Sequence, residues 1–222
     1  MITVHHLKKS RSHRVLWLLE ELQISYNLKI YERDSKTNRA PAALTKIHPL
    51  GKSPIITDGK KVISESAVIL EYILDQYGNG KLRPKDTQSA AYQDYQYFMH
   101  YTEGSFMPLL VLSLIFNMMP KQPMPFFVKP IMKEISKNIH KIYINPQIHL
   151  HLQFLEKKLK TEKWFAGNQF SVADIQIGFA IHCAKSLLAE NFNYARLNQF
   201  LNEIEKRPAY QQAIKKGGPV DL

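Results

Sequence analysis

The segment His48-Pro-Leu-Gly-Lys-Ser-Pro-Ile-Ile-Thr-Asp-Gly-Lys-Lys-Val-Ile-Ser-Glu-Ser-Ala-Val-Ile-Leu-Glu-Tyr-Ile73 decides the fold. Two short apolar strands, Pro54–Thr57 and Lys61–Ser64, flank an Asp58-Gly59 turn, which is the pattern of a β-hairpin. Apolar residues then recur at helical spacing, so we expect a helix that opens at Ser64 or Glu65.

The junction between this hairpin and helix has the chemistry of a pocket for a small anionic peptide. Proline has no amide hydrogen, so we expect Pro54 at the first residue of its strand, beside a free backbone edge at Ser53. Exposed strand edges hydrogen-bond extended peptides, and helix N-termini, here at Glu65-Ser66, bind carboxylates. The two features together predict the pocket.

The segments before the hairpin complete one α/β unit. Ile2–Leu7 and Tyr26–Tyr31 read as strands, and Arg14–Leu22 between them reads as a buried helix. A strand-helix-strand unit of this length implies parallel strands joined by a right-handed crossover. A short helix is expected at Pro41–Ile47. The order βαβ and then ββα is that of a thioredoxin-like domain.

The second half of the chain is expected to be all-helical. Gly78-Asn79-Gly80 begins a linker, so the predicted domains are residues 1–80 and 87–222. Strand patterns disappear beyond it, and the aromatic stretch Ala90–Phe116 and the amphipathic stretch Ile148–Leu159 have helical spacing. Ser171 and Asp174 form a capping-box motif at the start of a further helix.

Charge and composition restrict the partners. The 222-residue chain carries a formal charge of +11, spread over both halves without an arginine-rich run, so we expect no nucleic-acid partner. The positive electrostatic field of such a charge attracts anionic small molecules and favours a position near acidic lipid. Four lysines at four-residue spacing, Lys129, Lys133, Lys137 and Lys141, predict one basic helix face, solvated or at most peripherally bound to a membrane.

The cysteine and histidine content argues against disulfides and metals. The one cysteine, Cys183, lies in an apolar helical run and is expected to be a buried small hydrophobe. His5 and His6 point to opposite faces of a strand, and His149 and His151 do not face each other on a helix. We therefore expect no metal site, and the lack of a secretory segment at the first residues favours a cytoplasmic location.

The chain resembles the glutathione transferases. In that family the residue before a cis-proline pairs with the cysteine backbone of glutathione, and a Glu/Gln-Ser pair at the next helix holds the γ-glutamyl carboxylate. Ser53, Pro54, Glu65 and Ser66 match these positions. The Trp-Phe-Ala-Gly and Ser-x-x-Asp motifs at 164–174 match the second domain. The loop and helix at 10–22, with its Ser-Arg-Ser start, and the segment at 126–131 look closest to a fungal and bacterial subgroup.

A transferase of this kind needs a donor that stabilises the glutathione thiolate. The loop before the first helix supplies two hydroxyls, Ser10 and Ser12. Ser10 lies four residues before Arg14, which resembles the spacing of the catalytic serine in serine-type members, so we favour Ser10 as the catalytic residue and leave Ser12 as the alternative. Tyrosine-type and cysteine-type chemistry is not expected, because no tyrosine precedes Tyr26 and no cysteine precedes Cys183.

The resemblance implies further contacts with the substrates. Lys52 would pair with the glycine carboxylate of glutathione, Arg11, Ser12 and His48 are further candidate contacts, and His48 stands where the family usually has asparagine. The second substrate is expected between the domains. Three residues that share a helix face, Tyr97, Tyr101 and Ser105, are the candidate pocket, with core or subunit contact as the other reading.

We therefore expect a two-domain enzyme, and the resemblance implies that it uses glutathione as co-substrate, attacks hydrophobic electrophiles in detoxification and is a homodimer. Glutathione peroxidase activity is a further expectation of the resemblance. Two alternatives remain: a non-catalytic glutathione- or ligand-binding protein of the same fold, and a membrane-peripheral scaffold that uses the basic face at 128–144.

Overall fold

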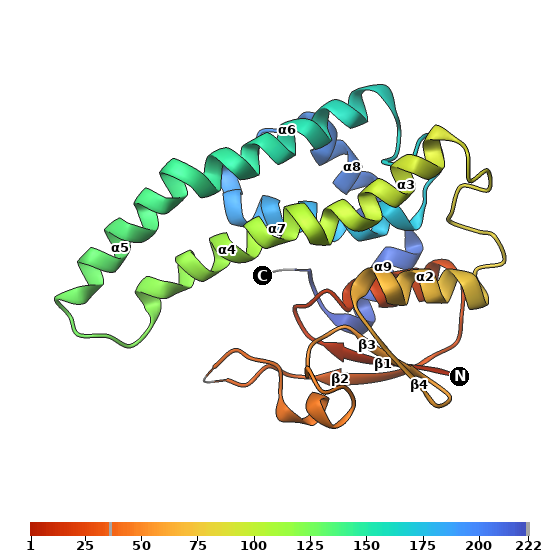
Figure 1. Ribbon diagram of the computed structural model, residues 1–222, viewed down its shortest axis with the longest axis horizontal. Helices are drawn as coiled ribbons and strands as arrows, with labels where there is room; N and C mark the ends of the chain where they lie inside the picture. Colours follow the sequence, from red (N-terminus) through yellow and green to blue (C-terminus); the bar gives the residue numbers. More distant parts are fainter. Residues whose placement is uncertain (36, 221–222) are drawn as a thin grey trace.

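The computed structural model describes residues 1–35 and 37–220 and has an α/β domain beside a helical domain (Figure 1). The α/β domain contains β1 Ile2–Leu7, α1 His13–Glu21, β2 Asn27–Tyr31, a 3₁₀ turn η1 Ala42–Lys46, β3 Ile55–Asp58, β4 Lys61–Ser64 and α2 Ser66–Tyr77. Its four strands lie in the order β2-β1-β3-β4.

The strand pairing confirms the thioredoxin-like order. β1 runs parallel to β2 and antiparallel to β3, and β3 pairs antiparallel with β4 across the Asp58-Gly59 turn. The turn needs a residue with positive φ, and Gly59 has φ 57°. β1 has the predicted bounds, while β3 begins one residue later than predicted. The Ser53-Pro54 bond is cis, and α2 begins at Ser66 with Glu65 as its N-cap.

The helical domain begins after a linker that follows Gly78. Its helices are α3 Ala90–Tyr101, π-helix η2 Thr102–Phe106, α4 Met107–Met118, 3₁₀ turn η3 Met119–Lys121, α5 Val128–Ile139, π-helix η4 His140–Ile144, α6 Asn145–Thr161, α7 Val172–Leu188, 3₁₀ turn η5 Ala189–Asn191, α8 Ala195–Glu205 and α9 Pro208–Gly217. The aromatic stretch at 90–116, predicted to have helical spacing, contains α3, η2 and most of α4. The helix predicted at 148–159 is confirmed within α6.

The buried helix α7 forms the centre of this domain, and its start confirms the capping box. Asp174 is fully buried, and its two carboxylate oxygens each accept a 2.8 Å hydrogen bond, from the amides of Phe165 and Ser171. The carboxylate therefore fixes the preceding turn as well as the end of the helix, which is more than a cap alone does.

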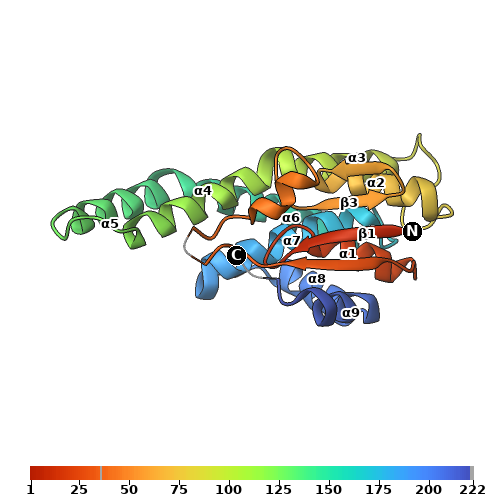
Figure 2. The same cartoon turned by 90° about the horizontal axis from the view of Figure 1, so that it is seen from below.

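The helices α4 and α5 extend together beyond the rest of the molecule (Figures 1 and 2). Lys129, Lys133, Lys137 and Lys141 are all exposed there, as predicted for a basic face. Two helical stretches, 90–121 and 172–191, are long and apolar enough to cross a membrane by length and composition alone. The second of them is mostly buried as the core helix α7.

The two domains share a core around α1. Every residue of α1 from His13 to Leu19 is buried, because the sheet lies on one side of the helix and α7 and α9 lie on the other. The last helix thus returns to the α/β domain, and its end at Gly217 reaches β1. This return brings the end of the helical domain next to the loop that follows β1.

Candidate functional site

Two hydroxyl groups meet where the loop after β1 approaches the hairpin. The side-chain oxygen of Ser10 lies 3.1 Å from that of Ser53, the residue before the cis-proline. The amide of Ser12 donates to Ser10 Oγ over 3.2 Å. Ser10 and Ser53 are both half-buried, so the two hydroxyls face a partly open site. The structure thus brings together the predicted catalytic serine and the predicted peptide-binding edge.

A second set of bonds runs inward from Ser10. Ser12 Oγ lies 2.8 Å from Ser10 Oγ and 2.8 Å from Nδ1 of His6, and Nε2 of His6 lies 2.8 Å from the carbonyl oxygen of Gly217. Ser12 is fully buried, with no exposed surface, and His6 is 1% exposed. Ser12 therefore forms the base of the site, and Ser10 is the hydroxyl nearer the surface.

The start of α2 has the features of an anion site. Glu65 is exposed and adopts φ 74°, a conformation that is strained for a residue with a side chain and that is common at ligand sites. The side chain of the N-cap residue Glu65 makes no hydrogen bond to the first amides of α2. Ser66 is buried at this end of the helix. The positive end of the helix dipole and its amides are available to a carboxylate.

The remaining predicted contacts lie in the loop before β3. Lys52 is exposed there. His48 Nε2 lies 3.2 Å from Ser64 Oγ, so this side chain is tied to the end of β4. The bond gives His48 a role in holding the loop against the hairpin.

A buried ion-pair cluster joins the loop to the helical domain. Arg14 has no exposed side-chain surface, and its guanidinium pairs with Glu103 and donates to Gln176 over 3.0 Å. Arg11 also lies 3.0 Å from Glu103. Burial alone would raise the pKa of Glu103, but Arg14 and Arg11 hold it below its usual value. Glu103 therefore stays ionised and orients Arg11 of the loop and Arg14 of α1.

The three residues predicted for the second substrate follow α3 and η2. Tyr97 stacks on Tyr101 at 5.3 Å between ring centroids, and the hydroxyl of Tyr101 bonds to His151 of α6. Ser105 is exposed in η2. These contacts bind the two tyrosines to α6, so their place in a substrate pocket stays a prediction.

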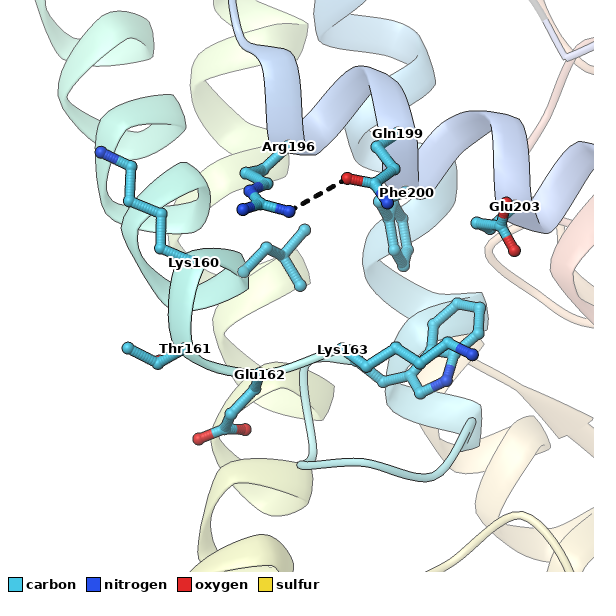
Figure 3. A pocket seen from close by; sticks show the side chains of 10 residues that line it. Lys160, Thr161, Glu162, Lys163, Arg196, Gln199, Phe200 and Glu203 are labelled. Carbon is cyan, nitrogen blue, oxygen red and sulfur yellow. Dashed lines mark hydrogen bonds between the residues drawn. The ribbon is translucent and has the colours of Figure 1, made fainter.

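One hollow, with a volume of about 440 Å³, lies between the end of α6 and α8 (Figure 3). Arg196 and Gln199 are hydrogen-bonded across its upper side, and Lys160, Lys163 and Glu203 surround its opening. None of its lining residues belongs to the predicted glutathione site.

Cys183 lies in the core, as predicted, and burial raises its thiol pKa to about 12. A thiol with this pKa stays protonated at neutral pH and is a poor nucleophile. Within residues 1–35 and 37–220, no cluster of three or more His, Cys, Asp or Glu side chains has the arrangement of a metal site.

The sequence reasoning missed His6 and Glu103 as parts of the site. Glu103 is the one acidic residue between Asp94 and Glu134, which was a usable signal for a buried partner of a basic group. His6 gave no such signal, because its bond to Gly217 joins residues 211 positions apart.

Both halves of the chain match family models. Residues 1–75 match the glutathione S-transferase N-terminal domain and residues 120–208 match the C-terminal domain. A protein named Glutathione S-transferase 3 from Schizosaccharomyces pombe is 36% identical over 220 residues, covering 97% of this chain and 88% of the relative.

Solved structures agree with this comparison. A glutathione S-transferase from Actinobacillus pleuropneumoniae superimposes with a TM-score of 0.81 at 32% identity, covering 98% of this chain and 93% of that one. A theta class glutathione S-transferase from Xanthomonas axonopodis pv. citri with glutathione bound shares the fold, with a TM-score of 0.74 at 21% identity and coverage of 98% and 99%.

Proposed function

The chain belongs to the glutathione S-transferase family and is a glutathione transferase, and from this premise we propose that it is of the serine type, with Ser10 as the catalytic residue. In this proposal the Ser10 hydroxyl donates to the glutathione thiolate, which then attacks a hydrophobic electrophile. The observation that carries the proposal is the 3.1 Å approach of Ser10 to Ser53, the residue before the cis-proline that leads into β3.

The energetics are sufficient for one hydroxyl. Lowering a thiol pKa by two units takes about 2.7 kcal/mol of differential stabilisation. A hydrogen bond to a charged group contributes about 1.5–3 kcal/mol. Ser10 Oγ also accepts from the Ser12 amide, which polarises the hydroxyl and strengthens it as a donor. Burial of Ser12 supports Ser10 rather than Ser12 as the group that touches sulfur.

The rest of glutathione would be held by the surrounding backbone and charges. We assign its cysteine backbone to the edge at Ser53-Pro54 and its γ-glutamyl carboxylate to Glu65-Ser66 at the start of α2. Lys52 is exposed on the loop and carries the charge that suits the glycine carboxylate.

Retention on immobilised glutathione and turnover of a chloronitroaromatic test the proposal together. We expect the wild type and Ser10→Ala to be retained, and Ser10→Ala to lose about 10- to 150-fold in kcat/KM, the range given by one charged hydrogen bond. Ser25→Ala, at an exposed serine between α1 and β2, controls for the loss of a surface hydroxyl. The KM of Ser105→Ala for the electrophile separately tests the second-substrate assignment.

Three results would change the assignment. Undiminished turnover in Ser10→Ala would show that another group stabilises the thiolate. Retention of the wild type without turnover, for aromatic halides and organic peroxides alike, would favour the ligand-binding alternative. Turnover of organic peroxides, without turnover of aromatic halides, would show that the enzyme acts as a glutathione peroxidase.

We also propose a cytoplasmic homodimer. Exposed apolar side chains of α6, with Leu150 58% exposed and Phe154 41% exposed, supply surface that a second subunit would cover. Sedimentation at micromolar protein tests this directly, because a monomeric mass would contradict it.

A further inference from the structure

The bonds from Ser10 to Gly217 have a fixed direction, which identifies a proton path. We call Ser10, Ser12 and His6 the hydroxyl relay. A carbonyl oxygen only accepts, so Nε2 of His6 must carry a proton and donate it to Gly217. A neutral imidazole with its proton on Nε2 has an accepting lone pair on Nδ1. Ser12 therefore donates its hydroxyl proton to His6 across the 2.8 Å contact.

This direction continues outward to Ser10. Because the Ser12 proton points to His6, Ser12 Oγ accepts from the Ser10 hydroxyl at 2.8 Å. The other acceptor near Ser12, the carbonyl of Leu7, is more distant at 3.3 Å. Before ionisation, Ser10 thus presents an oxygen lone pair, and not its proton, toward the thiol.

We propose that His6 takes up the thiol proton of bound glutathione through Ser10 and Ser12. The S–H bond breaks and its proton passes to Ser10 Oγ, while the Ser10 proton passes to Ser12 Oγ and the Ser12 proton passes to Nδ1 of His6. Each hydroxyl regains a proton, and no electron leaves the system. The products are a thiolate that accepts from Ser10 and an imidazolium that donates to Ser12 and Gly217. His6 returns its proton to solvent after the sulfur has bonded to carbon.

This step rests on the proposed role of Ser10 at the sulfur. His6 does not touch glutathione, so it is a positioning residue that acts through two hydroxyls. The relay also explains why Ser10 ends as a donor to the thiolate while it remains bonded to Ser12. Without His6, the Ser10 hydroxyl would have to break its hydrogen bond to Ser12 Oγ before it could donate its proton to the sulfur.

The surroundings of His6 favour a neutral ring until the thiolate forms. Burial lowers its pKa, Lys8 just after β1 lowers it further, and the carbonyl of Gly217 in α9 opposes both effects. His13 of α1 is a second titratable neighbour, and burial lowers its pKa to about 3, so it is neutral as well. A thiolate formed at the far end of the relay supplies the negative charge that compensates the imidazolium.

The carbonyl at Gly217 is held by close packing. A Cβ at this position would lie 2.6 Å from Leu16 and 3.0 Å from the His6 ring, so only glycine permits the approach of α9 to His6. The Gly217 carbonyl accepts a hydrogen bond from Nε2–H of His6 and thereby fixes the orientation and tautomer of the imidazole ring.

The test compares thiolate formation with proton release when glutathione binds. Ultraviolet difference absorbance measures the amount of thiolate formed, and a pH indicator in weakly buffered solution at about pH 7 measures the protons released. We expect the wild type to form thiolate with little proton release, because His6 retains the proton. In His6→Gln the base is absent, so we expect less thiolate and about one proton released for each thiolate formed. We also expect the kcat of His6→Gln at about pH 6.5 to fall about tenfold below that of the wild type, which corresponds to a one-unit rise in the pKa of the bound thiol. The kcat of this variant should recover at higher pH.

Three variants keep this test interpretable. His5→Gln is the matched control, because His5 is also a buried histidine of β1 and points to the opposite face of the strand, toward Tyr31 and Thr57. Ser12→Ala interrupts the relay without changing His6 and should reproduce the His6→Gln proton count even if His6→Gln folds poorly. Ser12→Thr keeps a hydroxyl and should restore retention of the proton.

The outcomes separate this proposal from the one on which it rests. About one proton released for each thiolate in the wild type would overturn the relay, as would His6→Gln and Ser12→Ala profiles equal to that of the wild type. If Ser10→Ala loses thiolate while those two variants keep it, Ser10 remains catalytic and the relay alone fails. If Ser10→Ala itself keeps full thiolate formation, both proposals fail.

Discussion

Ser10 Oγ and Ser53 Oγ lie 3.1 Å apart although 43 positions separate them in the chain. One belongs to the loop before α1, and the other belongs to the residue before the cis-proline. The contact makes the predicted catalytic hydroxyl and the predicted peptide-binding edge one continuous surface.

A Ser53→Ala variant measures how much this contact supports Ser10. Removal of the hydroxyl eliminates one partly buried hydrogen bond, so we expect kcat/KM to fall about fivefold, equivalent to about 1 kcal/mol. The backbone edge remains, so the KM for glutathione should stay near that of the wild type. A large rise in this KM with kcat unchanged would instead show that the Ser53 side chain itself binds the peptide.

Glu103→Gln should destabilise the protein by about 3 kcal/mol, because it leaves the fully buried Arg14 without its carboxylate. The loss is expected near the lower end of the range for buried pairs, because 28% of the Glu103 side chain is exposed. Urea unfolding followed by circular dichroism measures it. Glu134→Gln removes an exposed partner of Lys137 at 3.9 Å and should cost less than about 0.5 kcal/mol. Equal losses in the two variants would contradict the structural role of Glu103.

Asp174→Ala should cost about 2–4 kcal/mol, because the buried amides of Phe165 and Ser171 both lose their acceptor. Ser89→Ala is a useful comparison, since Ser89 caps α3 through a single 3.2 Å bond to the amide of Tyr92. Its loss should be about 1 kcal/mol. Thermal or chemical unfolding of both variants compares them, and a difference below about 0.5 kcal/mol would show that Asp174 acts only as a cap.

His13 should make the protein less stable in acid. Burial lowers its pKa from 6.5 to about 3, so the unfolded chain binds a proton that the folded protein excludes. Stability is therefore lost as the pH falls from 6.5 toward 3, by about 1.4 kcal/mol for each pH unit.

A His13→Phe variant isolates this effect, because phenylalanine keeps an aromatic ring against Tyr210 and does not titrate. Between about pH 7.5 and pH 5 the wild type should lose about 2 kcal/mol relative to the variant. The same substitution at the exposed His100 serves as the control. A difference in unfolding free energy between the wild type and His13→Phe that does not change with pH would contradict the prediction.

Much of the fold could be predicted from local patterns. β1 and β4 have the predicted bounds, because alternating residues and the Asp58-Gly59 turn determine them locally. The prediction that Pro54 is the first residue of its strand was wrong by one residue: β3 is Ile55–Asp58, because Pro54 has no amide to donate and Asp58 pairs with Ile2 and Lys61. Long helices such as α6 were predicted from their spacing alone.

Features that depend on distant contacts could not be predicted. The π-helix η2 lies within the stretch predicted to have helical spacing and turns Glu103 toward two arginines about 90 positions earlier. No local pattern specifies an i→i+5 turn, because its irregular geometry is retained by the contacts it permits. The same limit applied to His6, whose partner at Gly217 is determined by the packing of α9 on α1.

The position of Arg14 limits how this protein can exchange parts with its relatives. Arg14 belongs to the first domain, yet Glu103, Gln176 and the ring of Phe179, which lies 4.6 Å from the guanidinium, all belong to the second. In a chimera that joined the first 80 residues to the helical domain of a relative, Arg14 would be buried without a carboxylate partner unless that domain had an acidic residue at the position of Glu103. The two modules can therefore be shuffled by recombination only as a matched set.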